Sequence, residues 1–176
     1  MGTRSIVSVP DGDGWKGRYV HWDGYPTGVG QSLIEIVMRD GIEVARRTIV
    51  DEHVYWSSID ASEGMANPDL HTGQIVPTGE QRELRPNVVV VGYGNADLNS
   101  EAAGEDPDKP YWMLNPSNFD CGAEWHYILG DRELFVSVVG WGDSAGTLKP
   151  FGTFPYTLES YDALAAAEKA YNESED

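Results

Sequence analysis

The chain has little cysteine, little positive charge and no long apolar run, and each shortage excludes a class of protein. Cys121 is the only cysteine among 176 residues, which excludes an intramolecular disulfide and a multi-cysteine zinc site. Residues 1–9 contain one basic residue and no apolar run of seven, so we expect neither a secretory signal nor a membrane anchor. Because sparse cysteine suits a reducing compartment, we expect a cytoplasmic protein of a bacterium or of a phage-infected cell.

The shortage of basic residues argues against polyanionic partners. Twelve lysines and arginines stand against twenty-nine aspartates and glutamates, which leaves a net charge of -17. Such a charge repels the phosphate backbone of nucleic acids and anionic lipid headgroups. We therefore expect no direct binding to nucleic acid and no association with a membrane. An acidic decoy for DNA-binding surfaces is an alternative, but a solvated acidic surface is the simpler interpretation.

Length and composition are those of one folded domain. A chain of 176 residues is near the common domain size, and 40 % of its residues are hydrophobic and 11 % aromatic. That is enough apolar material for a packed core. We expect a single domain over residues 1–176, with long loops at 58–85 and 94–110 and a frayed acidic tail at 172–176.

Two hairpins and one further strand account for the predicted sheet. The β-rich runs 3–9 and 16–22 flank a Pro/Gly/Asp turn, and the runs 124–129 and 134–139 flank a second turn. Residues 87–93 contain the unbroken apolar run Val88–Val91, which predicts a strand covered on both faces or near the sheet centre. Together these runs predict an antiparallel sheet of about five strands.

Apolar spacing predicts three helices. Residues 33–38 have helical spacing and end before Gly41, which suits a helix stop, and Ile42, Ala45 and Ile49 continue the pattern in a second helix. A last helix starts near Thr157 or Ser160, either of which can cap it. We expect the helices to pack on one face of the sheet, which gives an α+β fold.

The best candidate for a ligand site is the glycine-rich segment between the first hairpin and the first helix. Glycines before a helix let backbone N–H groups approach an anion that the helix dipole favours. The segment matches neither dinucleotide-binding nor phosphate-loop spacing, and Pro26 removes one donor, so a plain tight turn is the competing interpretation. The candidate ligand-binding residues are His21, Asp23, Gly24, Tyr25, Gly28 and Gly30.

Catalytic and metal-binding patterns are weak. His21 and Asp23 would share a face if the strand continued through Asp23, and only this pair suggests a metal-assisted reaction. The other histidines lack metal-ligand spacing, and neither Ser57 nor Cys121 lies in a recognisable nucleophile motif. We therefore expect no metal and no cofactor. The patterns favour a non-catalytic protein but leave catalysis undecided.

The opening residues and the glycine-rich segment resemble a set of small phage and bacterial proteins of unknown function. The shared features are a Thr-Arg-Ser strand at 3–5 and the run His21-Trp22-Asp23-Gly24-Tyr25-Pro26-x-Gly28-x-Gly30. Residues 92–94 and the strand at 124–129 are similar to an actinobacterial branch of that set. The resemblance implies a phage association and no particular activity.

Two functions from different classes follow. The first is a non-catalytic, phage-associated binding protein that captures a small phosphorylated ligand or a host protein with residues 23–30. The second is a small metal-assisted hydrolase that uses His21 and Asp23. The sequence leaves the ligand and the oligomeric state open.

Overall fold

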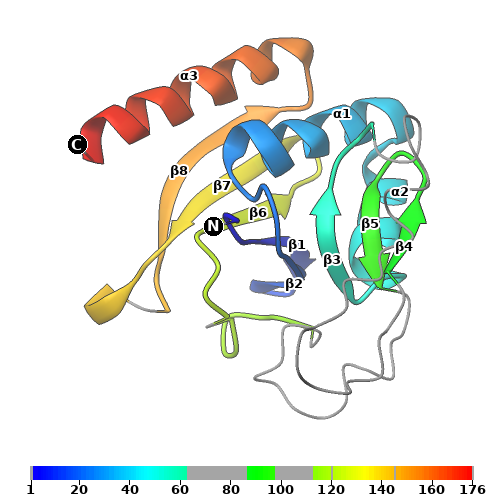
Figure 1. Cartoon of the computed structure of the whole chain (residues 1–176), viewed down its shortest axis with the longest axis horizontal. Helices are drawn as coiled ribbons and strands as arrows, with labels where there is room; N and C mark the ends of the chain where they lie inside the picture. Colours follow the sequence, from blue (N-terminus) through cyan, green and yellow to red (C-terminus); the bar gives the residue numbers. More distant parts are fainter. Residues whose placement is uncertain (1, 63–86, 98–112, 120, 145, 176) are drawn as a thin grey trace.

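The computed structural model describes residues 2–62, 87–97, 113–119, 121–144 and 146–175. The strands in these residues form one mixed sheet of eight strands in the order β4-β5-β3-β2-β1-β6-β7-β8 (Figure 1). They are β1 (Ser5–Asp11), β2 (Gly14–Val20), β3 (Tyr55–Ile59), β4 (Asn87–Val90), β5 (Gly94–Asp97), β6 (Trp125–Leu129), β7 (Glu133–Val139) and β8 (Leu148–Pro155). Helices and strands are both present, as predicted, but the predicted antiparallel sheet of about five strands is wrong.

Both predicted hairpins are confirmed. In the first, β1 and β2 pair antiparallel from Ser5 opposite Val20 to Asp11 opposite Gly14, and the turn includes Gly12 at a φ of 56°. In the second, β6 and β7 pair from Trp125 opposite Val138 to Leu129 opposite Leu134. Local turn chemistry fixes such pairings, which is why the sequence predicts them.

The sheet is mixed because each strand of the first hairpin also pairs in parallel with a strand outside that hairpin. Strand β1 pairs parallel with β6, with Ser5 opposite Trp125 and Ser8 opposite Ile128. On the other edge of the first hairpin, β2 pairs parallel with β3, with Tyr19 opposite Tyr55. Parallel pairs need long connections, so neighbouring residues carry no local sign of them.

The sequence does not predict three of the strands, which are β3, β5 and β8. Strand β5 has no β-branched residue, and β8 contains Pro150 and Pro155, which a strand tolerates best at an edge. Strand β3 runs to Ile59, so residues 58–59 of the predicted loop 58–85 are strand. Strand β5 likewise occupies the start of the predicted loop 94–110, while 63–86 and 98–112 lie outside the described residues.

For residues 87–93 the sequence predicts a strand covered on both faces or near the sheet centre, and the central position is wrong. Among the described residues, β4 pairs with β5 alone and lies at one end of the strand order. The turn after it leaves Val91 68 % exposed. Within the strand, Val89 and Val90 are both half-buried. The valine run therefore reflects strand propensity at an end of the sheet.

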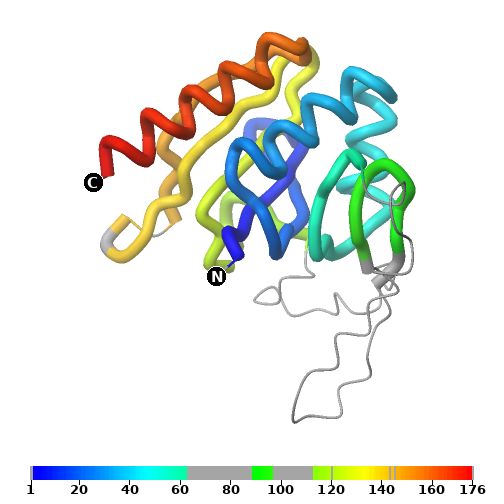
Figure 2. Tube along the Cα trace, turned by 45° about the horizontal axis from the view of Figure 1, so that its top comes forward, coloured from blue at the N-terminus to red at the C-terminus, as the bar shows by residue number. Residues whose placement is uncertain are grey.

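The helices lie on one face of the sheet. They are α1 (Gln31–Asp40), α2 (Ile42–Arg46) and α3 (Leu158–Glu175), with π-helical turns at Pro26–Gly30 and Arg47–Asp51 and a 3-10 turn at Gly142–Ser144. Gly41 separates α1 from α2 at a φ of 86°, as predicted. Helix α3 follows Thr157 and continues to Glu175, and Figure 2 shows it running alongside β7 and β8. Among the described residues, no helix is long and apolar enough to cross a membrane.

Alternation along the strands separates two cores. Val7, Tyr127 and Leu134 face the helices and pack with Leu33 of α1 and Leu164 of α3 in the larger core. The opposite face forms a smaller core, which residues 113–119 and 121–123 cover. Its buried members are Ile6, Trp15, Tyr19, Leu114, Phe119, Ala123 and Val139.

Candidate functional site

The glycine-rich segment is mostly the first turn of a helix and not an open loop. Strand β2 ends at Val20, Asp23 takes a φ of 55°, and the π-helical turn then begins at Pro26 and leads into α1. The N–H of Val29 donates to the carbonyl of Asp23 over 2.9 Å, which ties the turn to the preceding residues. The predicted order of strand, glycine-rich segment and helix is therefore confirmed, with a much shorter loop.

The glycines of this segment have packing reasons of their own. A Cβ on Gly24 would lie 2.8 Å from Ser5 Cβ, and one on Gly28 would lie 2.1 Å from the Asp23 carbonyl oxygen. A Cβ on Gly30 would lie 3.2 Å from the ring of Tyr127, a tight contact that a small shift would relieve. Close backbone approach alone therefore accounts for two of the predicted site glycines.

The structure does not join His21 and Asp23 as the sequence predicts, because the strand ends before them. His21 Nδ1 lies 2.8 Å from Tyr19 Oη, whereas the Asp23 carboxylate accepts a 3.3 Å bond from Tyr25 Oη. Burial lowers the pKa of His21, and the positive charge of Arg4 lowers it further. Both effects favour the neutral ring.

Metal ligands do not gather in the described part of the chain. No three histidine, cysteine, aspartate or glutamate side chains in those ranges lie close enough to hold one ion. The alternative of a metal-assisted hydrolase therefore has no ligand set within these residues.

The helix N-terminus at which the sequence predicts a phosphate already holds a carboxylate. The backbone N–H of Thr27 donates to Glu168 Oε2 of α3 over 2.7 Å. A negative group at this position is stabilised by the free N–H groups and the dipole of the helix. The chain thus places its own anion where an anionic ligand was expected.

Beside this contact lies a cavity of about 290 Å³, which we call the aromatic–acidic cavity. It lies where the start of β1, the turn before α1, the ends of β6 and β7, and α3 meet. Its aromatic lining consists of Tyr25, Trp125, Trp141 and Tyr171. Its polar lining consists of Thr3, Glu124, Glu168 and Asn172. Among the predicted site residues, Tyr25 lines this cavity and His21 does not.

The rings of the aromatic–acidic cavity hold one another in place. Trp125 and Tyr171 meet edge to face with centroids 5.4 Å apart, and Phe151 contacts both rings from behind. Trp125 is almost fully buried, while Trp141 is 54 % exposed and forms the outer wall. Edge-to-face packing fixes ring orientation, so the inner wall is rigid.

The charge in the cavity is negative and not neutralised by the described residues. Within the described ranges, neither Glu124 nor Glu168 forms an ion pair. Burial raises the pKa of Tyr25, and the charges of Asp23 and Glu168 raise it further. Tyr25 therefore stays protonated, and its neutral ring keeps the electron-rich face that attracts cations.

A serine–histidine pair elsewhere in the fold has the wrong surroundings for catalysis. Ser8 Oγ lies 2.8 Å from His126 Nε2 and donates to the Tyr127 carbonyl, so His126 Nε2 carries the proton of that contact. Both side chains are completely buried, and Trp15 covers the imidazole with centroids 4.3 Å apart. Burial lowers the pKa of His126 to about 3, which makes it a poor base.

Most of the aromatic–acidic cavity is not predictable from the sequence. The sequence pattern assigns Trp125 and Tyr171 to packing, and Glu168 is one acidic residue among many. One signal is present: Glu168 and Tyr171 have helical spacing and share a face with Leu164, so a charge lies between two apolar positions of the helix.

Comparison of the chain with protein families, with curated proteins and with solved structures finds no match.

Proposed function

We propose that this protein is a non-catalytic binding protein that captures a positively charged group in the aromatic–acidic cavity. One observation carries the proposal: four aromatic rings and two carboxylates line the same cavity. Neither carboxylate has an ion-pair partner among the described residues. Aromatic faces and carboxylates together favour a cation such as a guanidinium or an ammonium group.

The size of the cavity favours a side chain over a larger molecule. Pockets for drug-sized ligands usually begin at about 300 Å³, and this cavity is at that lower limit. An arginine or lysine side chain of a partner protein presents a cation of suitable size on a flexible stem. This argument develops the expectation of a host-protein partner from the sequence.

The phosphorylated ligand expected from the sequence fits this geometry less well. Glu168 occupies the Thr27 N–H, and Glu124 adds a second negative charge to the same cavity. Phosphate would meet repulsion from both carboxylates. The net charge of -17 also attracts basic partners over long distances and slows the approach of anions.

The test is a fluorescence titration of the tryptophans with N-acetyl-arginine amide. We expect Glu168→Gln to weaken binding by about tenfold, since hydrogen bonds to charged groups contribute about 1.5–3 kcal/mol. Glutamine keeps an oxygen that can accept from Thr27, so the helix start is preserved. Glu173→Gln, an equal change of charge on the same helix outside the cavity lining, should leave the affinity within about twofold.

Tyr25 supplies a second comparison. Tyr25→Ala removes the ring and should weaken binding, whereas Tyr25→Phe keeps the ring and loses only the bond to Asp23. Equal affinity for wild type, Glu168→Gln and Tyr25→Ala would refute the proposed function.

A further inference from the structure

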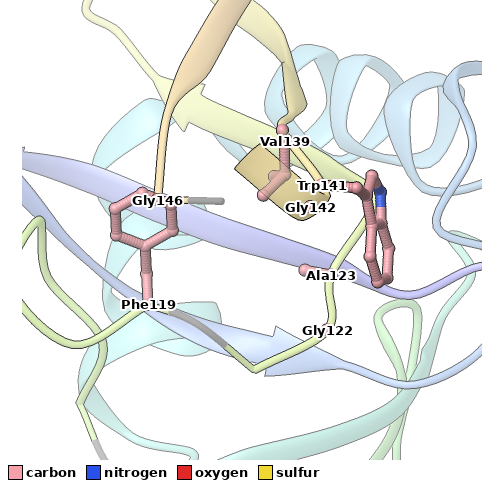
Figure 3. Close-up of a pocket in the computed structure, with 8 residues that line it drawn as sticks. Phe119, Gly122, Ala123, Val139, Trp141, Gly142 and Gly146 are labelled. Atoms are coloured by element: carbon pink, nitrogen blue, oxygen red, sulfur yellow. The ribbon is translucent and has the colours of Figure 1, made fainter. Parts of the chain in front are cut away.

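A second cavity lies directly beside the first and differs from it in chemistry. It has a volume of about 240 Å³, and we call it the apolar cavity. Its side-chain lining consists of Phe119, Ala123, Val139 and Trp141, and four glycines complete its walls. Figure 3 shows Phe119 and Trp141 on opposite sides of it, with Val139 and Ala123 between them. None of the described residues that line it carries a charged side chain.

Trp141 joins the two cavities, because its side chain lines both. The indole is 54 % exposed, although the Phe119 and Val139 side chains that line the same cavity are buried. Tryptophan is enriched among the residues that dominate binding interfaces. Their burial by a partner removes apolar area from water at low conformational cost.

We infer that the two cavities together form a docking groove for a protein segment in extended conformation that carries an apolar and a basic side chain separated by one residue. This inference rests on the proposed function and names the partner class. The basic side chain enters the aromatic–acidic cavity, where the charges of Glu124 and Glu168 are complementary to it. The apolar side chain enters the apolar cavity on the other side of Trp141. In an extended segment the two would be residues i and i+2, which point to the same face.

The test measures the preference for the apolar residue separately from the affinity for the basic one. The probes are acetyl-Leu-Ser-Arg-amide and acetyl-Arg-Ser-Leu-amide, which cover both chain directions, each compared with the peptide in which glycine replaces leucine. We expect one leucine peptide to bind at least about tenfold more tightly than its glycine partner, because burial of a leucine side chain is worth about that much. Equal affinities of both leucine peptides and their glycine partners would overturn the inference.

Variants then locate the preference. Ala123→Val fills part of the apolar cavity and should reduce the leucine preference to less than about threefold while binding of the glycine peptide is kept. Ala123 is buried and the variant can fail to fold, so Trp141→Ala, a change at an exposed position, serves as the second test and should also reduce the preference. Trp22→Ala, another exposed tryptophan that lines neither cavity, is the control and should retain the preference.

The outcomes separate the two proposals. If wild type shows no preference for leucine but Glu168→Gln loses binding of all peptides, the docking groove is refuted and the proposed function stands. A leucine preference that survives both Ala123→Val and Trp141→Ala also refutes the docking groove. Sedimentation of wild type and Trp141→Ala covers the remaining occupant: a dimer that Trp141→Ala dissociates would show that a second copy fills the groove, contrary to the inference.

Discussion

At the scale of single residues, His126 shows how a side chain that looks catalytic can be structural. Its imidazole is sealed between β1, β6 and the ring of Trp15, and its Nε2 donates a hydrogen bond to Ser8. Its Nδ1 has no hydrogen-bond partner among the described residues. Protonation would place an unsolvated charge in the smaller core, so the folded state holds His126 neutral.

This neutrality predicts acid sensitivity. The pKa of His126 is about 3 in the folded state and near 6.5 in the unfolded state, so its stabilising contribution is complete above pH 6.5 and decreases as the pH falls toward 3. Between pH 6.5 and 5 the wild type should lose roughly 1.5 kcal/mol more free energy of unfolding than His126→Gln, which does not titrate. Urea denaturation at both pH values measures the difference. Parallel pH profiles of the two proteins would show that His126 is not held neutral.

At the scale of secondary structure, the start of α1 depends on glycines for different reasons. A Cβ on Gly28 would meet the Asp23 carbonyl oxygen at 2.1 Å, whereas a Cβ on Gly30 would meet the ring of Tyr127 at the longer distance of 3.2 Å. Alanine in a helix is favoured over glycine by up to about 1 kcal/mol, which opposes any steric cost. The two positions should therefore respond differently to the same substitution.

We expect Gly28→Ala to reduce the free energy of unfolding by about 1–3 kcal/mol, because the Asp23 backbone would have to move to admit the methyl group. Gly30→Ala should stay within about 1 kcal/mol of wild type, since helix propensity offsets the contact with Tyr127. Midpoints of urea denaturation measure both. A stabilising effect of Gly28→Ala would show that the turn at 26–30 leaves room for a side chain beside Asp23.

The same scale shows what the sequence predicts and what it does not. The two hairpins, the helix after Gly30 and the stop at Gly41 follow from local turn and spacing rules, and they are confirmed. Strands β5 and β8 have no local pattern that predicts them. Strand β5 forms where Gly94 packs against the backbone of Ser58, and β8 forms by pairing with β7. The parallel pairings depend on contacts between distant segments, which periodicity cannot detect.

The candidate site follows the same division. The sequence predicts Tyr25 because it interrupts a glycine-rich run, and Tyr25 lines the aromatic–acidic cavity. Trp125, Trp141 and Glu168 come from β6, from the residues after β7 and from α3, and only the fold brings them together. Sequence reasoning also places an anionic ligand at the helix start, which Glu168 occupies in the structure. It misses Glu168 because the contact between Glu168 and Thr27 spans 141 residues and has no local signature.

At the scale of the whole molecule, net charge and site chemistry point to the same class of partner. A net charge of -17 attracts basic proteins. Salt at 0.1 M screens this attraction beyond about 10 Å. Under the proposed function, the aromatic–acidic cavity would supply a specific position for one cation, and the adjacent apolar cavity would supply a second contact. Electrostatic attraction would then raise the encounter rate, and the two cavities would set the specificity.

The most direct measurement of the central claim is an NMR titration of the whole protein observed at the tryptophan indole N–H signals. N-acetyl-arginine amide is compared with N-acetyl-citrulline amide, which has nearly the same shape and no charge. The account predicts that arginine shifts the signals of Trp125 and Trp141, that citrulline shifts them far less, and that Trp56, whose indole N–H donates to Ile49 in the larger core, stays unchanged. Equal shifts with both compounds, or no shift at Trp125 and Trp141, would contradict it.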